Sequence, residues 1–250
     1  MKAHARLVAE LRHGRTVLRE IRSASPLTLI PRRGHGPAVV HLVGSATAPL
    51  GGDELRLSVR VGPGARLRLS GVAATLALPG SRAAESLSTV DIEVGEAGVL
   101  EYLPEPAVVT ARARHTAELV ASLDRGARLH TREVLVLGRT GERPGCLRAT
   151  QRVVRNDVPL LHQTLTTGDP ALEDSLAYLA GRRVVATEVL VWGEDPAGAV
   201  SGDWWSLTPL AAGGSLITSL ATGAVSARRD LAQARGLHPG WASDPGATLA

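Results

Sequence analysis

The 250-residue sequence contains no Phe, two Tyr and four Trp, so Leu, Val and Ala must fill its core. Aliphatic side chains at this density favour strands and leave little material for an aromatic-lined pocket. Lys2 is the only lysine, which excludes a lysine nucleophile or Schiff base elsewhere in the chain. The other basic residues are arginines scattered among acids, with a net charge of +4 and no block of like charge.

Further absences narrow the class of protein. Cys146 is the only cysteine, so an internal disulfide and a thiolate metal cluster are both excluded. No stretch approaches the ~18 apolar residues of a membrane span, and the charged start MKAHARLVAELRHGR lacks the apolar centre of a signal peptide. We therefore expect a cytoplasmic protein with no membrane partner. A nucleic-acid partner is not expected either, because the chain has no basic face and few stacking aromatics.

Alternating apolar and polar residues from Leu55 to Leu69 flank Gly62-Pro63-Gly64, which predicts a hairpin or a strand corner. Similar stretches follow at 90–103 and 117–138. Their spacings of 33 and 29 residues, measured between aligned corners, predict stacked, similar β units rather than a strict repeat. Aligning VGPGARLRL with VGEAGVLEY and LDRGARLHT superimposes two sets of apolar positions: Val61, Val94 and Leu123, and then Leu67, Leu100 and Leu129.

The pattern as a whole predicts a mainly β protein, a layered and β-helix-like stack of short antiparallel strands with about two α-helices. Two more strands are expected on either side of Asn156-Asp157, and another at 184–192. Helical spacing is confined to 170–181 and 223–235. We expect one domain over residues 1–250, with about 25 N-terminal and 14 C-terminal residues loose.

Sequence signatures of nucleotide-binding sites and hydrolases are missing. Gly51-Gly52 precedes a strand, whereas a phosphate-binding glycine loop precedes a helix, and no G-x-S-x-G motif is present. Two H-x-x-E pairs begin at His115 and His130, but on a strand residues three apart point to opposite faces. A metal-dependent hydrolase that uses His115, His130 and Glu133 stays open as an alternative, provided that the three side chains converge on one ion.

Two acidic stretches have both a structural and a functional interpretation. Asp53-Glu54 follows Gly51-Gly52, where glycine permits φ > 0 and Asp is a preferred turn residue, so a polar turn is the simpler interpretation. In the segment LEYLPEP, Pro104 and Pro106 hold Glu105 rigidly at the end of a strand. An exposed acid in that position suits a contact with a partner or an ion.

Taken in order, these motifs resemble the urease accessory protein D family (UreD, called UreH in some bacteria), from about Pro26 to about Arg235. The resemblance rests on the family's GGD turn, its L-E-[WY]-L-P-E-P segment and its G-A-R-L…E…L-G-R…G-E run. Leu76 departs from the family pattern, which commonly has a lysine there, and SATAPL replaces a glycine-rich run. The matching positions with expected structural or partner-binding roles are Gly51, Gly52, Leu100, Tyr102, Pro104, Glu105, Pro106, Gly138, Arg139 and Gly141.

The resemblance implies a non-enzymatic scaffold in urease maturation. Such proteins bind the urease apoprotein and accessory protein F, through which the GTPase accessory protein G is recruited. Nickel released on GTP hydrolysis is expected to pass through an internal channel to the urease active site, where a lysine is carbamylated by CO2. The implied fold is a β-rich, layered stack with few helices. No tightly bound cofactor is implied, only transient Ni²⁺.

A channel for Ni²⁺ needs spaced carboxylates that hold the ion weakly, because tight ligation would trap it. The strand and helix at 215–235 are expected to form the docking surface for accessory protein F. A pure adaptor without a metal path stays open as an alternative, beside the hydrolase. The expected channel residues are Asp53, Glu54, Glu101, Glu133 and Glu142.

Overall fold

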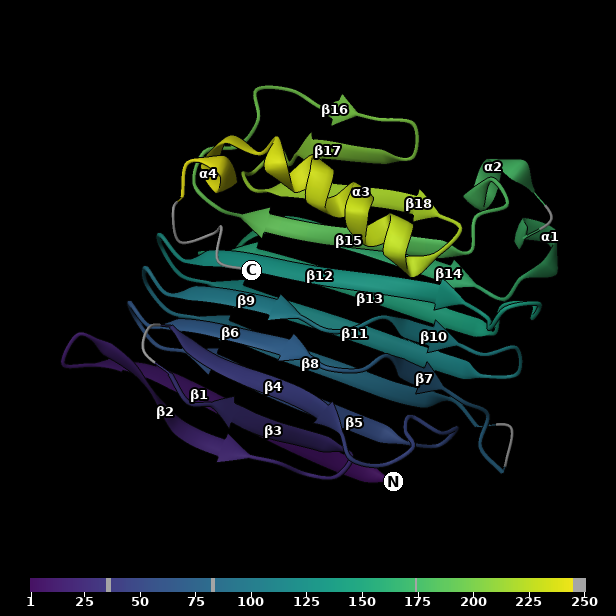
Figure 1. Ribbon diagram of the computed structural model, residues 1–250, viewed down its shortest axis with the longest axis horizontal. Coiled ribbons are helices and arrows are strands. Elements are labelled where there is room, and N and C mark those ends of the chain that lie inside the picture. Colours follow the sequence, from purple (N-terminus) through teal and green to yellow (C-terminus); the bar gives the residue numbers. More distant parts are fainter. Residues whose placement is uncertain (35–36, 82–83, 174, 245–250) are drawn as a thin grey trace.

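Two β-sheets packed face to face form most of the protein in the computed structural model, which describes residues 1–34, 37–81, 84–173 and 175–244 (Figure 1). The seven-stranded sheet has the spatial order β14 (Val158–Thr167), β13 (Cys146–Arg155), β11 (Arg114–Leu123), β8 (Ser86–Val94), β5 (Glu54–Val61), β1 (Lys2–Arg12), β2 (Arg15–Arg22). The eleven-stranded sheet has the order β16 (Val200–Ser201), β17 (Trp205–Pro209), β18 (Ser215–Ala221), β15 (Val184–Val191), β12 (Arg128–Leu137), β9 (Val99–Leu103), β6 (Arg66–Gly71), β4 (Ala38–Gly44), β3 (Leu27–Arg32). Two short strands complete it, β7 (Thr75–Ala77) and β10 (Ala107–Val109), and β10 pairs with both β12 and β7.

The chain crosses from the seven-stranded to the eleven-stranded sheet at similar corners after β5, β8 and β11. Each corner contains a residue with positive φ, namely Gly64 (65°), Ala97 (52°) and Gly126 (69°). The stacked units predicted from the repeat are confirmed, and the corner rather than the hairpin is the correct alternative at 62–64. The aligned positions are also ladder partners, Val61 with Val94 and Val94 with Leu123, then Leu67 with Leu100 and Leu100 with Leu129.

The predicted antiparallel strand direction is wrong for the centre of both sheets. The ladders β1–β5–β8–β11–β13 and β4–β6–β9–β12 are parallel, and antiparallel pairs occur towards the ends of the stack. Each unit makes one strand in each sheet before the next begins, so equivalent strands of successive units run in the same direction. Period-two alternation is the same for both directions and therefore could not distinguish them.

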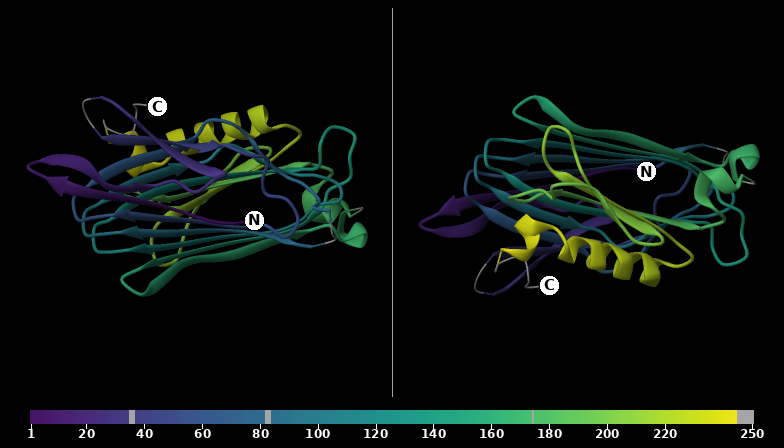
Figure 2. Two further views of the ribbon diagram at one scale, coloured as in Figure 1. Left: turned by 90° about the horizontal axis from the view of Figure 1, so that it is seen from below. Right: turned by 90° about the horizontal axis from the view of Figure 1, so that it is seen from above.

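Aliphatic side chains fill the space between the two sheets, including Leu7, Leu69 and Leu129, each less than 2% exposed. A second apolar cluster lies on the outer face of the eleven-stranded sheet, where α3 (Ala224–Gly236) and α4 (Pro239–Ala242) pack on it with Leu231 and Trp241. Figure 2 shows the strands in two layers and α3 outside them. Each β12 side chain therefore faces either the interior or the outer face on which α3 and α4 pack.

The helix expected at 223–235 is confirmed as α3. The segment expected to be helical at 170–181 contains two single turns, α1 (Pro170–Glu173) and α2 (Leu176–Leu179). The first 25 residues are not loose, because β1 alternates buried Ala5 and Leu7 with charged residues. The chain is also ordered through α4, since His238 is fully buried there. The last part of the tail, 245–250, lies outside the described residues.

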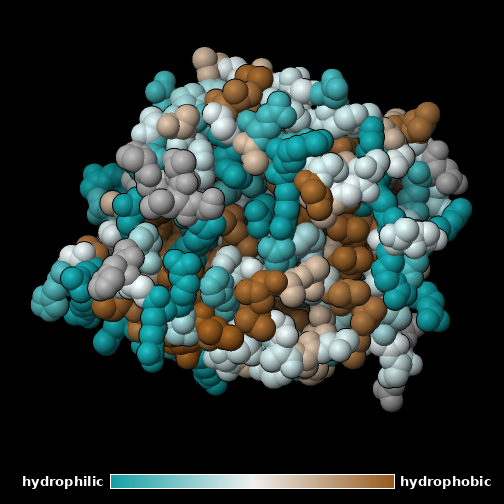
Figure 3. All heavy atoms as spheres, viewed as in Figure 1, coloured by the Kyte–Doolittle hydropathy of each residue, from teal (hydrophilic) through white to brown (hydrophobic). Residues whose placement is uncertain are grey.

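The outer face of the eleven-stranded sheet is only partly covered by α3. Figure 3 shows apolar side chains gathered on this face next to the helix. Ile30 on β3, Val72 after β6 and Leu76 on β7 are 47%, 52% and 39% exposed. A group of exposed apolar residues of this kind is typical of a protein contact surface. Among the described residues, no helix is long and apolar enough to cross a membrane.

Candidate functional site

Glu133 on β12 is a half-buried carboxylate that lies between the two sheets. Its Oε2 accepts a hydrogen bond of 2.7 Å from Gln151 Nε2 of β13, which belongs to the opposite sheet. Gln151 also donates to Thr187 Oγ1 at 3.1 Å and accepts from Gln163 Nε2 at 3.4 Å. In the described part of the chain Glu133 has no ion pair with an arginine, lysine or histidine. The interior therefore contains a carboxylate held by the neutral amide of Gln151.

Burial controls the charge of this carboxylate. Removal from water raises the pKa of Glu133, and the hydrogen bond from Gln151 offsets only part of that effect. Burial, together with the charge of Glu133, likewise raises the pKa of Tyr102 on β9. A cation that reached this position would stabilise the ionised carboxylate, because opposite charge offsets the cost of burial.

A cavity of about 190 Å³ lies beside Glu133, between the two sheets. At roughly 30 Å³ per water, this volume holds about six water molecules. His115 also reaches the cavity and contacts Ser86 Oγ at 2.9 Å, and burial lowers the pKa of His115. The other lining residues come from both sheets and include Leu57, Ser88, Val90, Ala117, Tyr102 and Leu135.

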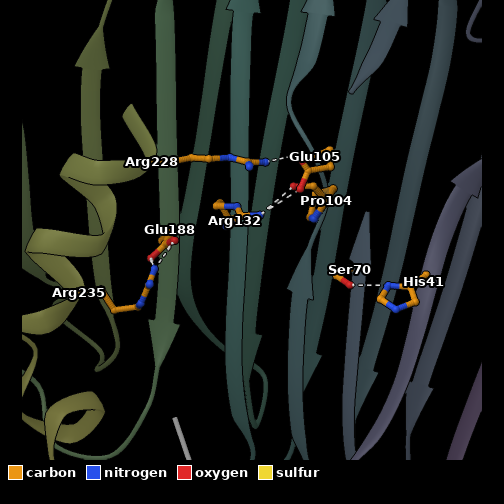
Figure 4. A network of polar contacts seen from close by, with 8 residues as sticks. All are labelled: His41, Ser70, Pro104, Glu105, Arg132, Glu188, Arg228 and Arg235. Carbon is orange, nitrogen blue, oxygen red and sulfur yellow. Dashed lines mark hydrogen bonds and ion pairs between the residues drawn. The ribbon is translucent and has the colours of Figure 1, made fainter. Parts of the chain in front are cut away.

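A charged cluster lies on the other face of β12, beneath α3. Glu188 of β15 is fully buried and accepts two hydrogen bonds of 2.7 Å from Arg235 Nη1 of α3 (Figure 4). His130 Nε2 lies 3.3 Å from Glu188 Oε2, and His130 Nδ1 lies 3.8 Å from Glu101 Oε2. Burial alone would raise the pKa of Glu188, but His130 and Arg235 outweigh it and lower the pKa to about 2. This cluster fastens α3 to the sheet.

Glu105 lies further along the same outer face and contacts two arginines (Figure 4). It accepts a hydrogen bond from Arg228 Nη2 of α3, and Arg132 Nη2 lies 4.0 Å from its other oxygen. The adjacent Gly71 is needed for this packing, since a Cβ atom there would lie 2.6 Å from the backbone nitrogen of Glu105. Glu105 is therefore a paired carboxylate, unlike Glu133.

Asp53 and Glu54 lie at the start of β5. Asp53 is buried, and its carboxylate accepts hydrogen bonds from the N-terminal amine of Met1 and, at 2.8 Å, from the backbone nitrogen of Leu50. Burial opposes ionisation of Asp53, but the amine and the backbone hydrogen bond outweigh it and lower its pKa. Glu54 is exposed and pairs with Lys2 at 2.8 Å. These contacts agree with the polar turn inferred from the glycine pair.

Glu142 lies in the loop between β12 and β13. Its carboxylate accepts hydrogen bonds from Arg139 Nε at 2.8 Å and from the Arg139 backbone nitrogen at 3.0 Å. These hydrogen bonds lower the pKa of Glu142 to about 2, although the group lies at the surface. Gly138 and Gly141 shape the loop with φ of 76° and 80°. Glu142 therefore has a local structural role.

The expected channel carboxylates do not gather in one place. Glu133 is interior, whereas Glu101 lies on the outer face with His130, and Asp53, Glu54 and Glu142 have local partners. Among the described residues, no group of three or more His, Cys, Asp or Glu side chains has an arrangement suited to holding a metal ion.

The three residues of the alternative hydrolase site are also separated. His115 and Glu133 face the interior, whereas His130 contacts Glu188 and Trp241 on the outer face. Their geometry does not meet the convergence that the hydrolase hypothesis requires.

Comparison with known proteins identifies the family. The sequence model of the family described as "UreD urease accessory protein" matches residues 1–245. A protein of Saccharopolyspora erythraea named "Urease accessory protein UreD 1" is 56% identical over 245 residues, which cover 96% of both chains. The chain belongs to the UreD family. Two other relatives named "Urease accessory protein UreD" are from Parafrankia sp. (40% identical, 98% of this chain and 91% of the relative) and Streptomyces coelicolor (38%, 92% and 93%).

The UreD motifs quoted from the sequence mark structural turns as well as site residues. Gly52 has φ of 92°, and a Cβ atom on Gly51 would lie 2.5 Å from the carbonyl oxygen of Ala84. In the segment LEYLPEP, Leu100 and Tyr102 are buried between the sheets, and the chain leaves β9 at Pro104. Membership of the UreD family therefore fits the geometry at these motifs.

Several residues of the site were not anticipated from the UreD resemblance. Gln151 supports Glu133 from the opposite sheet, and Glu188, Arg228 and Arg235 complete the outer-face clusters. Glu188 has a recognisable signal, because it interrupts the otherwise apolar stretch VVATEVLV, and a buried acid requires a partner. The arginines of α3 carry no such signal, since charged residues on a helix are usually exposed.

Proposed function

We propose that this chain is a scaffold for urease maturation that holds the urease apoprotein and accessory proteins F and G together and provides a path for Ni²⁺. The observation that carries the nickel path is Glu133, a half-buried carboxylate that lines a cavity between the sheets and has no cationic partner among the described residues. Membership of the UreD family supports the role in urease maturation. The proposed place of action is the cytoplasm, and no catalytic step is assigned to the chain.

The chemistry of the cavity suits an ion in transit. Of the three glutamates in the lining, Glu105 is paired with arginine and Glu118 is exposed, which leaves Glu133 as the carboxylate that faces the interior. A passing Ni²⁺ held by one carboxylate keeps most of its water and is released easily. Gln151, Thr187 and Tyr102 offer neutral oxygen atoms nearby, which can contact bound water. Glu101 is a second candidate on the outer face, beside His130. Asp53, Glu54 and Glu142 remain predicted channel residues that would have to leave their present partners.

Exposed residues support the proposed contacts with other proteins. Val225 on α3 is 85% exposed, and Leu237 after the helix is 53% exposed, within or next to the segment expected to contact accessory protein F. Ile30, Val72 and Leu76 add apolar surface on the same side of the sheet. We assign α3 and β18 to the contact with protein F.

The experiment is urease activation in cells that express Glu133→Gln in place of the natural chain. Glu133→Gln keeps the shape of the side chain and can still accept the hydrogen bond from Gln151, but it removes the negative charge. The urease–accessory complex should therefore form, and the nickel content of urease should fall several-fold. Glu133→Asp should retain part of the delivery. Glu93→Gln is the matched control and should deliver normally, because Glu93 is an exposed carboxylate that pairs with Arg60 and is not a predicted channel residue.

A pure adaptor without a metal path is the second candidate, favoured by the local pairing of Asp53, Glu54 and Glu142. The same experiment separates the two candidates. Normal nickel content with Glu133→Gln and an intact complex would establish the adaptor. Failure of a tagged chain to co-purify with urease and the accessory proteins would contradict both.

A further inference from the structure

The eleven-stranded sheet has a break next to Glu133. Pairing of β9 with β12 ends at Tyr102–Thr131, and pairing of β10 with β12 begins at Ala107–Leu135. Between these points the chain makes the Pro104–Pro106 turn, so Arg132, Glu133 and Val134 of β12 have no ladder partner on that side among the described residues. The break lies where the proline pair interrupts the strand.

The interior cavity extends to this break. Its lining includes Tyr102 and Glu133, which face the interior, together with Glu105 and Arg132, which contact each other on the outer face. A route from the outer surface to Glu133 therefore crosses the sheet between β9 and β10. Glu105 and its arginines lie at the outer end of this route (Figure 4).

The charge at this outer end opposes a cation. Arg132 and Arg228 share the one carboxylate of Glu105, and Arg132 Nη2 also lies 3.4 Å from the carbonyl oxygen of Pro104. The Nε atoms of both arginines are buried and, within the described residues, have no hydrogen-bond acceptor. Glu188 and Arg235 also act on Arg132, so three positive charges stand against two negative charges. The opening is net positive, and a divalent ion is repelled.

Arg228 differs from Arg132 because it belongs to α3, which packs on the outside of the sheet, whereas Arg132 belongs to a strand of the sheet. Arg235, two turns later on α3, is fixed to the buried Glu188 by two hydrogen bonds. Nearer the N-terminus of α3, two charged residues contact the sheet side: Arg228 donates a hydrogen bond to Glu105, and Asp230 accepts one from Ser219. Ala227 and Leu231 hold α3 on the sheet, so Arg228 leaves Glu105 when its own side chain turns away or when a partner displaces the helix.

We propose that Arg228 is a latch, which with Arg132 keeps the opening between β9 and β10 closed to cations, and that withdrawal of Arg228 from Glu105 opens the route to Glu133. The latch rests on the proposed function, in which an ion passes Glu133 and α3 contacts accessory protein F. It adds regulation to that path, because the free chain excludes the ion and a chain with a displaced α3 admits it.

The test measures how fast a cation reaches position 133 in the isolated full-length chain. Cys146→Ser removes the natural thiol and Glu133→Cys places one at the site, and binding of Cd²⁺ to that thiolate is followed by its ultraviolet charge-transfer absorption in stopped flow. Adding Arg228→Gln should raise the rate of Cd²⁺ binding about tenfold, in line with the effect of local charge on ion association. Arg229→Gln, at the exposed neighbouring position, is the matched control and should leave the rate unchanged.

Arg228→Lys separates the loss of charge from a change of shape. It keeps a positive charge that can pair with Glu105, so it should not accelerate Cd²⁺ binding. Unchanged binding with Arg228→Gln, or equal acceleration by Arg229→Gln or Arg228→Lys, would overturn the latch. If the latch is supported but Glu133→Gln still loads urease with nickel, the proposed nickel path fails and the latch stands.

A second measurement covers the case in which Glu133→Cys does not fold. Amide hydrogen exchange of the otherwise natural chain should be faster at 104–107 with Arg228→Gln than with Arg229→Gln, as judged by mass spectrometry. Equal exchange in the two variants would contradict the latch.

Discussion

Replacement of Arg235 by alanine should destabilise the protein strongly, because it leaves the buried Glu188 without its main hydrogen-bond donor. Breaking a buried ion pair from one side typically costs about 3–5 kcal/mol. The lowered pKa of Glu188 agrees in direction: a fall from 4.5 to about 2 corresponds to about 3 kcal/mol of stabilisation of the charged form, which His130 and then Arg235 supply together. We therefore expect Arg235→Ala to lower the free energy of unfolding by about 3 kcal/mol.

The assay is urea denaturation followed by tryptophan fluorescence. Trp192 and Trp241 lie in the apolar cluster beneath α3 with ring centroids 5.0 Å apart, so they report on this region. Arg229→Ala is the matched control, because Arg229 is 79% exposed on the same helix. The double variant with Glu188→Leu should recover much of the loss, since it removes the unpaired charge.

The pH dependence gives an independent check. The folded pKa of Glu188 is lowered, so its stabilisation is fully present above the unfolded pKa of 4.5 and is lost as the pH falls towards about 2. Arg235→Ala should flatten this part of the stability profile. A loss below about 0.5 kcal/mol, the range of ordinary surface substitutions, or an equal loss with Arg229→Ala, would refute the reasoning.

Two further predictions concern the stack itself. Gly71→Ala should lower the free energy of unfolding by about 1–3 kcal/mol and lower the melting temperature, because its Cβ atom would lie 2.6 Å from the Glu105 backbone nitrogen. Gly44→Ala is the control: its Cβ atom would meet nothing within 4 Å, so the melting temperature should stay unchanged. Leu100→Ala should lower the free energy of unfolding, measured by urea denaturation, by about 2–5 kcal/mol, since Leu100 is fully buried at the centre of the stack. A loss no larger than that of a surface substitution would contradict this position of Leu100.

The repeating part of the fold could be predicted from the sequence because its information is local. The apolar positions Val61, Val94 and Leu123 follow similar corners, and side chains that stack in one core must share a period. The direction of the strands could not be predicted, because it depends on how successive units are joined. The N-terminal strand β1 was missed because its small interior residues, such as Ala3 and Ala5, make its alternation weak.

The candidate site could be predicted only in part, because its contacts join residues far apart in the sequence. Glu133 was found through the family resemblance, but its partner Gln151 comes from the opposite sheet, and no local pattern connects the two. The pairing of Glu105 with Arg228 spans 123 residues and depends on where α3 packs. Asp53 and Glu142, by contrast, bond within their own turns, so turn chemistry accounts for them directly.

The central claim is that nickel passes through the interior between the two sheets, and blocking that interior tests it most directly. Ala117 on β11 lines the cavity opposite Glu133, whereas the neighbouring Thr116 points outward and contacts Glu85. Both are replaced by phenylalanine, and the nickel content of urease is measured by mass spectrometry after activation with an intact accessory complex. We predict several-fold less nickel with Ala117→Phe and a normal content with Thr116→Phe. Normal nickel with Ala117→Phe in an intact complex would contradict the path.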